Sequence, residues 1–383
     1  MNNQRAFTLV EAIVMLMVIA ILAAVAIPLA LRLFEETAED STRTEMQNLK
    51  QAIIGNPNEI KENMRSDFGF LGDIGCLPTT AFGGLNRLLN NNGGNYASWV
   101  FNAAKQVGAG WNGPYITGSF AGEEPEDFTK DQWGNAYTYT PAGGGCPLTA
   151  TLTSNGADVS SSADDITLSI AANETTATVT GVVKSADGFR FASIPVDINY
   201  PVNGALTTVT NTTDTNGVYN FNSIPFGKRS VQARPTLGYA SNSGITTPGS
   251  NDTDLQFVIY NFTTSAVTIT NLVATYSGGA CYNQVWFNGT RVYNNPSRCS
   301  GQTATFNNCP GGSCTIAASS TTLPPQVAVI DAPNVRLPDI IIFPQGTSAF
   351  VELRNFSNAV NGVAFTITFS NGSVIKFTAK SGG

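Results

Sequence analysis

The stretch RAFTLVEAIVMLMVIAILAAVAIPLALRL, residues 5–33, decides the fold of the N-terminal part of this chain. Residues 12–31 are uncharged and mostly apolar. As a helix they would span roughly 30 Å, the thickness of the hydrocarbon core of a bilayer. The stretch also carries a carboxylate, Glu11, near its start and a proline, Pro28, near its end. Because a charged group in lipid is costly, Glu11 requires a partner or a route to water.

A cleaved secretory signal is the alternative interpretation of this stretch. Residues 24–26, Ala-Val-Ala, have the pattern of small residues at a signal-peptidase site. However, Glu11 lies where a signal peptide is apolar, and apolar residues recur at helical spacings through 38–53, beyond the span. Residues 55–57, Gly-Asn-Pro, then end the pattern. We therefore predict one long helix over residues 7–54, with a membrane span at 12–31.

The composition excludes several classes of protein. The chain has 383 residues, which predicts two or three domains. Its net charge is −7 and only 12% of its residues are charged, which argues against nucleic-acid binding. It has no histidine, so the commonest general base and the usual zinc ligand are missing. We expect no enzymatic activity.

The six cysteines all follow the apolar stretch, at 76, 146, 281, 299, 309 and 314. Their even number and their export behind a membrane span predict disulfides formed in an oxidising compartment. We favour one bridge between Cys76 and Cys146 and two bridges within residues 281–314, among Cys281, Cys299, Cys309 and Cys314. Six cysteines permit many other pairings, which the sequence leaves open.

Residues 5–16, RAFTLVEAIVML, resemble the class III signal of type IV pilins and of type II secretion pseudopilins. This resemblance implies that a prepilin peptidase removes the leader 1–6 by cutting between Ala6 and Phe7, and that the new amine of Phe7 is methylated. The family has Gly where this chain has Ala6, so we expect slower processing. Pro28 matches a family position where the helix loosens on assembly.

The same resemblance explains Glu11, which becomes the fifth residue of the processed chain. In the family this glutamate pairs with the N-terminal amine of a neighbouring subunit inside the filament. Since cleavage creates that amine, only processed subunits satisfy Glu11. The alternative is that Glu11 reaches the membrane interface as a tolerated charge.

Residues 55–172 are predicted to form a small antiparallel-sheet head. The segments FGFLGDIGCLPTT (68–80) and DQWGNAYTYT (131–140) resemble segments of major pseudopilins, and the segments YTYT (137–140) and TATLT (149–153) alternate like half-buried antiparallel strands. Residues 154–170, SNGADVSSSADDITLSI, resemble the calcium loop of that family. The resemblance implies Ca²⁺ ligands at Asn155, Asp158, Asp164 and Asp165, completed by carbonyls of 160–162. Carboxylates and carbonyls on a bendable loop suit Ca²⁺; the alternative is a polar turn without metal.

The C-terminal half is predicted to be all β. Within residues 173–237, the segments GVVKSADG, IPVDI, TDTNGVYNF and IPFGKRSVQA resemble a carboxypeptidase-regulatory-like β-sandwich, a module that most often serves as a spacer. A linker at 238–251 precedes an Ig-like β-sandwich over 252–383. Its cysteines would staple a long loop, 281–314, whose aromatic residues would either bind a glycan or a protein or pack in the core, which is the commoner role. These residues are Tyr282, Trp286, Phe287 and Tyr293.

The fold class we predict is α+β: a long N-terminal transmembrane or filament helix, a small antiparallel-sheet head and two all-β sandwiches. The resemblance implies a structural subunit of a type IV pilus-like or type II secretion pseudopilus filament. Its partners would be further copies of itself, the prepilin peptidase, an assembly ATPase and a platform protein. It would begin in the inner membrane and end in a periplasmic or extracellular filament. The alternative is a minor pilin or membrane-anchored adhesin whose distal sandwiches bind a surface, glycan or protein.

Overall fold

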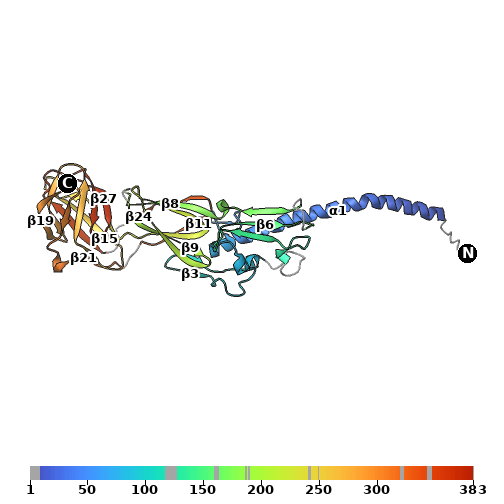
Figure 1. Ribbon diagram of the computed structural model, residues 1–383. Coiled ribbons are helices and arrows are strands. Elements are labelled where there is room, and N and C mark those ends of the chain that lie inside the picture. The colour runs from blue at the N-terminus through green and yellow to red at the C-terminus, as the bar shows by residue number, and fades with distance from the viewer. Residues whose placement is uncertain are drawn as a thin grey trace.

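The computed structural model describes residues 9–116, 127–158, 164–185, 188, 190–239, 243–248, 250–319, 323–342 and 347–382. The molecule is elongated, with a long helix at one end and β-structure along the rest of its length (Figure 1). The first described residues and the C-terminus lie at opposite ends (Figure 1). The predicted fold class is confirmed, because one long helix is followed by several small, mostly antiparallel sheets.

Helix α1 (Leu9–Ile54) has two halves with different surroundings. Its N-terminal half is apolar on every side and exposed, and its C-terminal half packs one face against the β-structure. The helix ends at Gly55, whose φ is 81°, and a Cβ there would lie 2.4 Å from the carbonyl oxygen of Asp67. Only glycine fits this end, so the predicted C-terminus of the helix is confirmed. The buried side chains are Thr42, Glu45, Met46, Leu49, Ala52, Ile53 and Ile54.

We call residues 55–174 the head. It contains one short helix, four 3₁₀ turns and three small antiparallel sheets. The helical elements are α2 (Gly69–Ile74), η1 (Thr80–Phe82), η2 (Gly84–Leu88), η3 (Asp127–Thr129) and η4 (Ala172–Glu174). The sheets are β1 (Ile60–Lys61) with β2 (Met64–Arg65), β3 (Val100–Asn102) with β4 (Val107–Ala109), and β5 (Thr138–Ala142), β6 (Thr149–Ser154) and β7 (Ile166–Ile170).

The first sandwich follows the head and consists of two sheets. One sheet has the order β10 (Ala205–Thr212), β9 (Pro195–Val202), β12 (Gly227–Ala233) and β22 (Gln326–Ile330). The other has the order β11 (Val218–Pro225), β8 (Thr176–Ser185) and β23 (Asn334–Arg336), and β24 (Ile340–Ile342) also pairs with β8. Strands β23 and β24 run parallel to β8, whereas the other pairs are antiparallel.

The distal sandwich lies at the end of the molecule away from α1 (Figure 1). One of its sheets has the order β13 (Leu237–Tyr239), β15 (Leu255–Asn261), β25 (Ser348–Arg354), β18 (Cys281–Phe287) and β19 (Thr290–Cys299), with β14 (Ile245–Thr246) also on β15. Another has the order β20 (Thr303–Thr305), β17 (Asn271–Tyr276), β26 (Ala364–Phe369) and β27 (Val374–Thr378). A small pair, β16 (Val267–Ile269) with β21 (Cys314–Ile316), and the turn η5 (Pro310–Gly312) complete it.

Two features of this topology differ from the boundaries expected from the sequence. Strands β22–β24 come from within 252–383, yet they pair with β12 and β8 of the first sandwich. The stretch 238–251, expected to be a linker, contributes to β13 and β14, which both pair with β15. Composition marks turns and strands locally, but the partner of a strand is set by long-range packing.

The hydrophobic residues form two separate cores. One core is continuous from Met46 of α1 through the head to Ile342 of β24, and the other lies within the distal sandwich, from Leu237 to Ala379. The head and the first sandwich therefore share a core and act as one body, which we call the proximal body. All six cysteines are bridged, as Cys76–Cys146, Cys281–Cys299 and Cys309–Cys314. This agrees with the pairing that we favoured.

Candidate functional site

The candidate site is the apolar half of α1. Large apolar side chains are exposed along it, from Leu9, which is 77% exposed, to Phe34, which is 72% exposed. Its most apolar 18-residue window has a mean hydropathy of 3.0, and by length and composition the helix can cross a membrane. No other described part of this chain covers that surface, which leaves it available to a bilayer or to other helices.

Glu11 and Pro28 both lie on this half of the helix. Glu11 is in the first described turn, and Pro28 is within the helix, where it has no N–H to donate to the carbonyl oxygen of Ala24. The cleavage and methylation residues Ala6 and Phe7 lie outside the described part of the chain. The structure therefore places the two predicted assembly residues on one exposed apolar rod, and their roles stay predictions.

The polar half of α1 is attached to the head through residues 131–140, the stretch that resembles a pseudopilin segment. Glu45 is buried and accepts hydrogen bonds from Tyr137 Oη, at 3.0 Å, and from Gln132 Nε2. The backbone N–H of Gln132 also donates to Thr42 Oγ1 at 3.3 Å. Sequence reasoning singled out this stretch by its resemblance, and its role here is to fix the helix to the sheet.

Asp131 gives this stretch its shape. Its Oδ1 accepts hydrogen bonds from the backbone N–H groups of Trp133, at 3.1 Å, and Asn135, at 2.8 Å. Its Oδ2 accepts one from Ser154 Oγ at 2.6 Å, which connects the turn to strand β6. Asn135 Nδ2 in turn donates to the carbonyl oxygen of Gly156 at 2.7 Å. The turn that holds α1 is thus tied to the start of the predicted calcium loop.

A second polar contact joins α1 to the end of the head. Lys50 Nζ lies 2.6 Å from Glu174 Oε1 and donates to the carbonyl oxygen of Ser169 at 3.0 Å. Burial alone would raise the pKa of Glu174, but hydrogen bonds from the N–H of Ala171 and from Lys50 hold this pKa below its usual value. The carboxylate therefore stays ionised and keeps its contact with the helix at neutral pH.

The predicted calcium ligands flank residues 159–163, which contain the expected carbonyl turn and lie outside the described residues. Asp164 Oδ2 accepts a hydrogen bond from the N–H of Ala157 at 2.8 Å, and its Oδ1 is buried with no hydrogen-bond partner among the described residues. That orphaned oxygen fits a cation. Asp158 and Asp165 are exposed, and the described residues hold no group of three or more cysteine, aspartate or glutamate side chains that suits a metal. Calcium binding therefore stays a prediction.

The aromatic residues expected on a stapled loop of the distal sandwich lie instead on strands β18 and β19. Tyr282, Phe287 and Tyr293 are buried in the distal core. Trp286 is half-buried, with the Arg354 guanidinium 4.4 Å from its ring centre. Core packing is therefore the role of Tyr282, Phe287 and Tyr293, whereas Trp286 lies outside the core and contacts Arg354. Cys281–Cys299 joins the paired strands β18 and β19, and Cys309–Cys314 closes the turn η5, so the two disulfides do not staple one long open loop.

Sequence reasoning missed a second exposed apolar site on the head. Trp99, Val100 and Phe101 are exposed at the β3–β4 hairpin. The signal in the sequence was the run WVFN, residues 99–102, which is apolar on both faces of a strand where alternation is expected.

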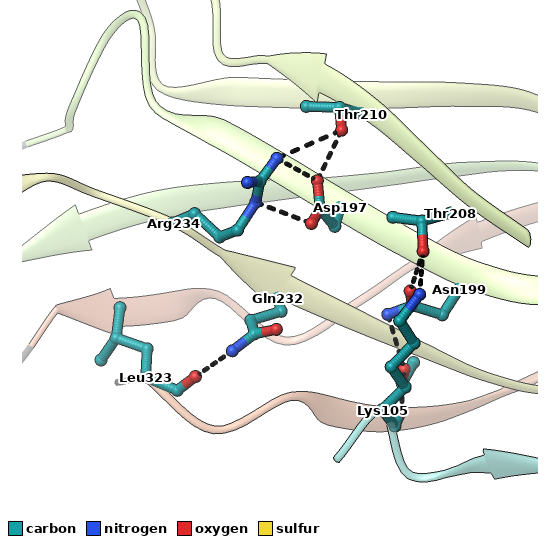
Figure 2. Close-up of polar contacts among 9 residues, drawn as sticks. Lys105, Asp197, Asn199, Thr208, Thr210, Gln232, Arg234 and Leu323 are labelled. Atoms are coloured by element: carbon teal, nitrogen blue, oxygen red, sulfur yellow. Dashed lines mark hydrogen bonds and ion pairs between the residues drawn. The ribbon is translucent and has the colours of Figure 1, made fainter. Parts of the chain in front are cut away.

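The β3–β4 hairpin also connects the head to the first sandwich through polar contacts. Lys105 Nζ donates to Thr208 Oγ1, which in turn donates to Asn199 Oδ1 at 2.7 Å (Figure 2). Ser230 Oγ donates to the carbonyl oxygen of Lys105. Because Asn199 and Ser230 are buried, these bonds satisfy polar groups that water does not reach.

Further polar side chains of the sheet formed by β10, β9, β12 and β22 also contact each other. Arg234 Nε lies 2.7 Å from Asp197 Oδ2, and Thr210 Oγ1 donates to Asp197 Oδ1 at 2.6 Å (Figure 2). Gln232 Nε2 donates to the carbonyl oxygen of Leu323 (Figure 2). On this face of the sheet, polar groups therefore satisfy one another's hydrogen bonds.

Comparison with known proteins gives one match at the N-terminus. Residues 1–27 match the prokaryotic N-terminal methylation motif, so the chain begins like a type IV pilin-like prepilin. No curated protein matches the chain.

Similar solved structures share little with this chain. The major pilin subunit BcpA of Bacillus cereus is 9% identical over 53% of this chain and 67% of its own, with a TM-score of 0.14. The full-length major pilin SpaD of Corynebacterium diphtheriae is 12% identical over 54% and 65%, with a TM-score of 0.17. The pilus protein RrgB of Streptococcus pneumoniae is 10% identical over 52% and 49%, with a TM-score of 0.16. At these TM-scores the likenesses support no assignment for this chain.

Proposed function

We propose that this chain is a structural subunit of a type IV pilus-like or type II secretion pseudopilus filament. The observation that carries the proposal is that the methylation motif of residues 1–27 overlaps the exposed apolar half of a long helix, α1. Before assembly, lipid of the inner membrane covers that helix, and in the filament other copies of α1 cover it. The prepilin peptidase, an assembly ATPase and a platform protein supply processing and force.

Glu11 provides the selection step in this proposal. A carboxylate in the apolar core costs several kcal/mol unless it is paired. The methylated amine of Phe7 of a neighbouring copy supplies the opposite charge, and it exists only after cleavage behind Ala6. An uncleaved chain has no such amine to offer to Glu11 of its neighbour, so incorporation would favour processed subunits.

Mass spectrometry of the N-terminus, on protein from the membrane and from sheared filaments, tests the processing. We expect a chain that starts at N-methylated Phe7. A chain that starts at Ile27, after the Ala-Val-Ala sequence, would mean secretory cleavage and would remove the filament function.

The change Glu11→Ala tests assembly. We expect it to leave the amount of protein in the membrane unchanged and to lower the yield of sheared filaments at least tenfold. The matched control is Glu39→Ala, which removes an exposed carboxylate of the same helix that pairs with Arg43 at 2.6 Å. Normal filament yield from Glu11→Ala, or an equal loss from Glu39→Ala, would contradict the role of Glu11.

One observation favours a second candidate function, that of a minor pilin or adhesin. The distal sandwich lies at the end of the molecule opposite to α1, where a filament would present it outward (Figure 1). The amount of this chain in purified filaments separates the two functions. A structural subunit dominates the filament, whereas an adhesin is present in a few copies and its loss abolishes surface binding but leaves filament yield unchanged.

A further inference from the structure

A cleft in the proximal body is not used by the proposed assembly. It has a volume of about 660 Å³ and lies where α2, the β3–β4 hairpin and strands β12 and β22 meet. This size is within the range of small-ligand sites, about 300–1,000 Å³. The residues that matter for its chemistry are Asp73, Trp99, Phe101, Asn112, Tyr115 and Lys228.

Trp99 and Phe101 line this cleft as two neighbouring, near-parallel aromatic rings, which we call the aromatic platform. Their ring centres are 6.4 Å apart and their planes differ by 25°. They are 39% and 48% exposed, although aromatic side chains of this size are more often buried. A Cβ at Gly108 would lie 2.2 Å from Cζ2 of Trp99, so the indole lies flat on the hairpin where only glycine leaves room. The platform is therefore held in place before any ligand arrives.

Polar groups line the same cleft. Tyr115 Oη donates to Asp73 Oδ2 at 3.1 Å and accepts from the N–H of Asn112 at 2.9 Å. Lys228 contributes an ammonium group with three donors. These bonds fix the carboxylate of Asp73 at the cleft wall, where its remaining lone pairs can accept further hydrogen bonds.

We propose that this cleft binds an oligosaccharide of β-1,4-linked pyranoses with equatorial substituents, such as a chain of glucose or N-acetylglucosamine. Each face of such a ring presents axial C–H groups, which pack on the π-face of an aromatic ring. The hydroxyl groups at the ring edge both donate and accept, so they match a carboxylate, an amide and an ammonium group. The aromatic platform and the polar wall therefore suit the two surfaces of one ligand.

A second copy of this chain is the competing occupant. Exposed Val100 and Val327 beside the platform would suit an apolar subunit contact. However, such a contact would remove Asp73 and Lys228 from water without matching their hydrogen bonds, at a cost in free energy. A hydroxyl-rich ligand satisfies these groups, and this difference favours the saccharide.

The test uses the full-length chain in a detergent without a sugar headgroup. It is titrated with cellotetraose and with tetra-N-acetylchitotetraose, and with maltotetraose as an α-linked comparison, by isothermal calorimetry. We expect saturable binding of at least one β-1,4-linked tetrasaccharide that is at least tenfold tighter than that of maltotetraose. Trp99→Ala should lower that affinity at least tenfold and Phe101→Ala severalfold. The matched control Trp286→Phe, in the distal sandwich, should leave it unchanged.

Three results would overturn the proposal. The first is no saturable binding of either β-1,4-linked tetrasaccharide. The second is an affinity that Trp99→Ala and Phe101→Ala both leave unchanged, which would place the saccharide elsewhere. The third is a loss of filament yield in these variants with unchanged tetrasaccharide affinity, which would make the surface a subunit contact. If Trp99→Ala does not fold, Phe101→Ala decides, because the Phe101 ring is half exposed.

Discussion

The proximal body and the distal sandwich are both rich in β-structure, but they are held together in different ways. In the proximal body, contacts join residues far apart in the sequence: the Cys76–Cys146 bridge, the Lys50–Glu174 ion pair and the paired strands β8 and β23. The distal sandwich also pairs strands that are far apart in the sequence, such as β15 with β25, but its two disulfides close over only 18 and 5 residues. The part of the chain that connects to α1 is thus cross-linked over long range, whereas the distal sandwich is stapled locally.

This difference matches the places of the two regions in the molecule. Any force on α1 reaches the proximal body first, through Glu45 and Lys50. A body whose ends are joined by long-range contacts unfolds as one unit, because breaking one contact does not release a short segment. We therefore expect two separate unfolding transitions, one for each region.

The largest effect that separates the two regions is expected from the disulfides. Cys76→Ser with Cys146→Ser opens a loop of 70 residues, whereas Cys309→Ser with Cys314→Ser opens one of 5. Loop-closure entropy predicts losses of about 4 and about 2 kcal/mol. Calorimetry should show the first pair lowering only the proximal transition and the second only the distal one. An equal loss for both pairs would contradict the comparison.

The next effect is expected from Arg229, which is 1% exposed and joins the head to the first sandwich. Its guanidinium donates to the carbonyl oxygens of Gly72, at 2.9 Å, and Pro225, at 3.0 Å. Arg229→Met leaves these acceptors buried without donors, so we expect the proximal transition to lose about 3 kcal/mol. Arg190→Met, at an exposed position, is the control and should cost less than about 0.5 kcal/mol. Similar losses from both changes would show that Arg229 does not join the two parts.

Calcium is expected to distinguish the two regions, because it would stabilise only the proximal body against unfolding. We propose that the loop of Asp158 and Asp164 binds it. At a concentration 100 times its Kd, calcium would then add about 2.7 kcal/mol to the proximal transition. Asp158→Ala should abolish this rise, and Glu59→Ala, at an exposed carboxylate of the head, should retain it. A melting curve of the wild type that is identical with calcium and with chelator would remove the site.

The smallest effect is expected from pH at the Lys50–Glu174 pair. Since the folded pKa of Glu174 is lowered, the pair stabilises fully above its usual value of 4.5 and loses this contribution as pH falls through the folded pKa. Because the Glu174 side chain is 36% exposed, we expect less than about 1 kcal/mol. The proximal Tm of Glu174→Gln should lie below that of the wild type at pH 6 and approach it at pH 3. A difference that is constant over this range would assign the effect to packing.

The parts of the fold that were predicted from sequence depend on local patterns. The helix through Ile54 follows from its apolar run, its spacing and the glycine at 55. Cys76 and Cys146 were paired correctly because the remaining four cysteines lie close together in the sequence. The methylation motif of residues 1–27 is likewise a contiguous signal.

The parts that were not predicted depend on contacts between distant segments. The sequence of strand β22 does not indicate that β12, 95 residues or more away, is its partner. Packing in the shared core selects this pairing. The run WVFN signals an apolar strand, but it does not predict which of its side chains are exposed or that Trp99 and Phe101 line a cleft. That arrangement depends on Gly108, on the facing strand, and on a cleft assembled from four elements.

The return of strands β22–β24 to the first sandwich means that the backbone passes between the two regions three times: after Ala233, after Ile316 and after Ile342. A protease cut in the first of these passages would leave the distal sandwich joined covalently only to β22–β24, which strand pairing and packing hold in the proximal body. Tension applied between the two regions would likewise be distributed over three segments rather than carried by one. The distal sandwich would therefore stay attached after one such cut as long as the proximal body remains folded, whereas a domain joined by one linker would be released.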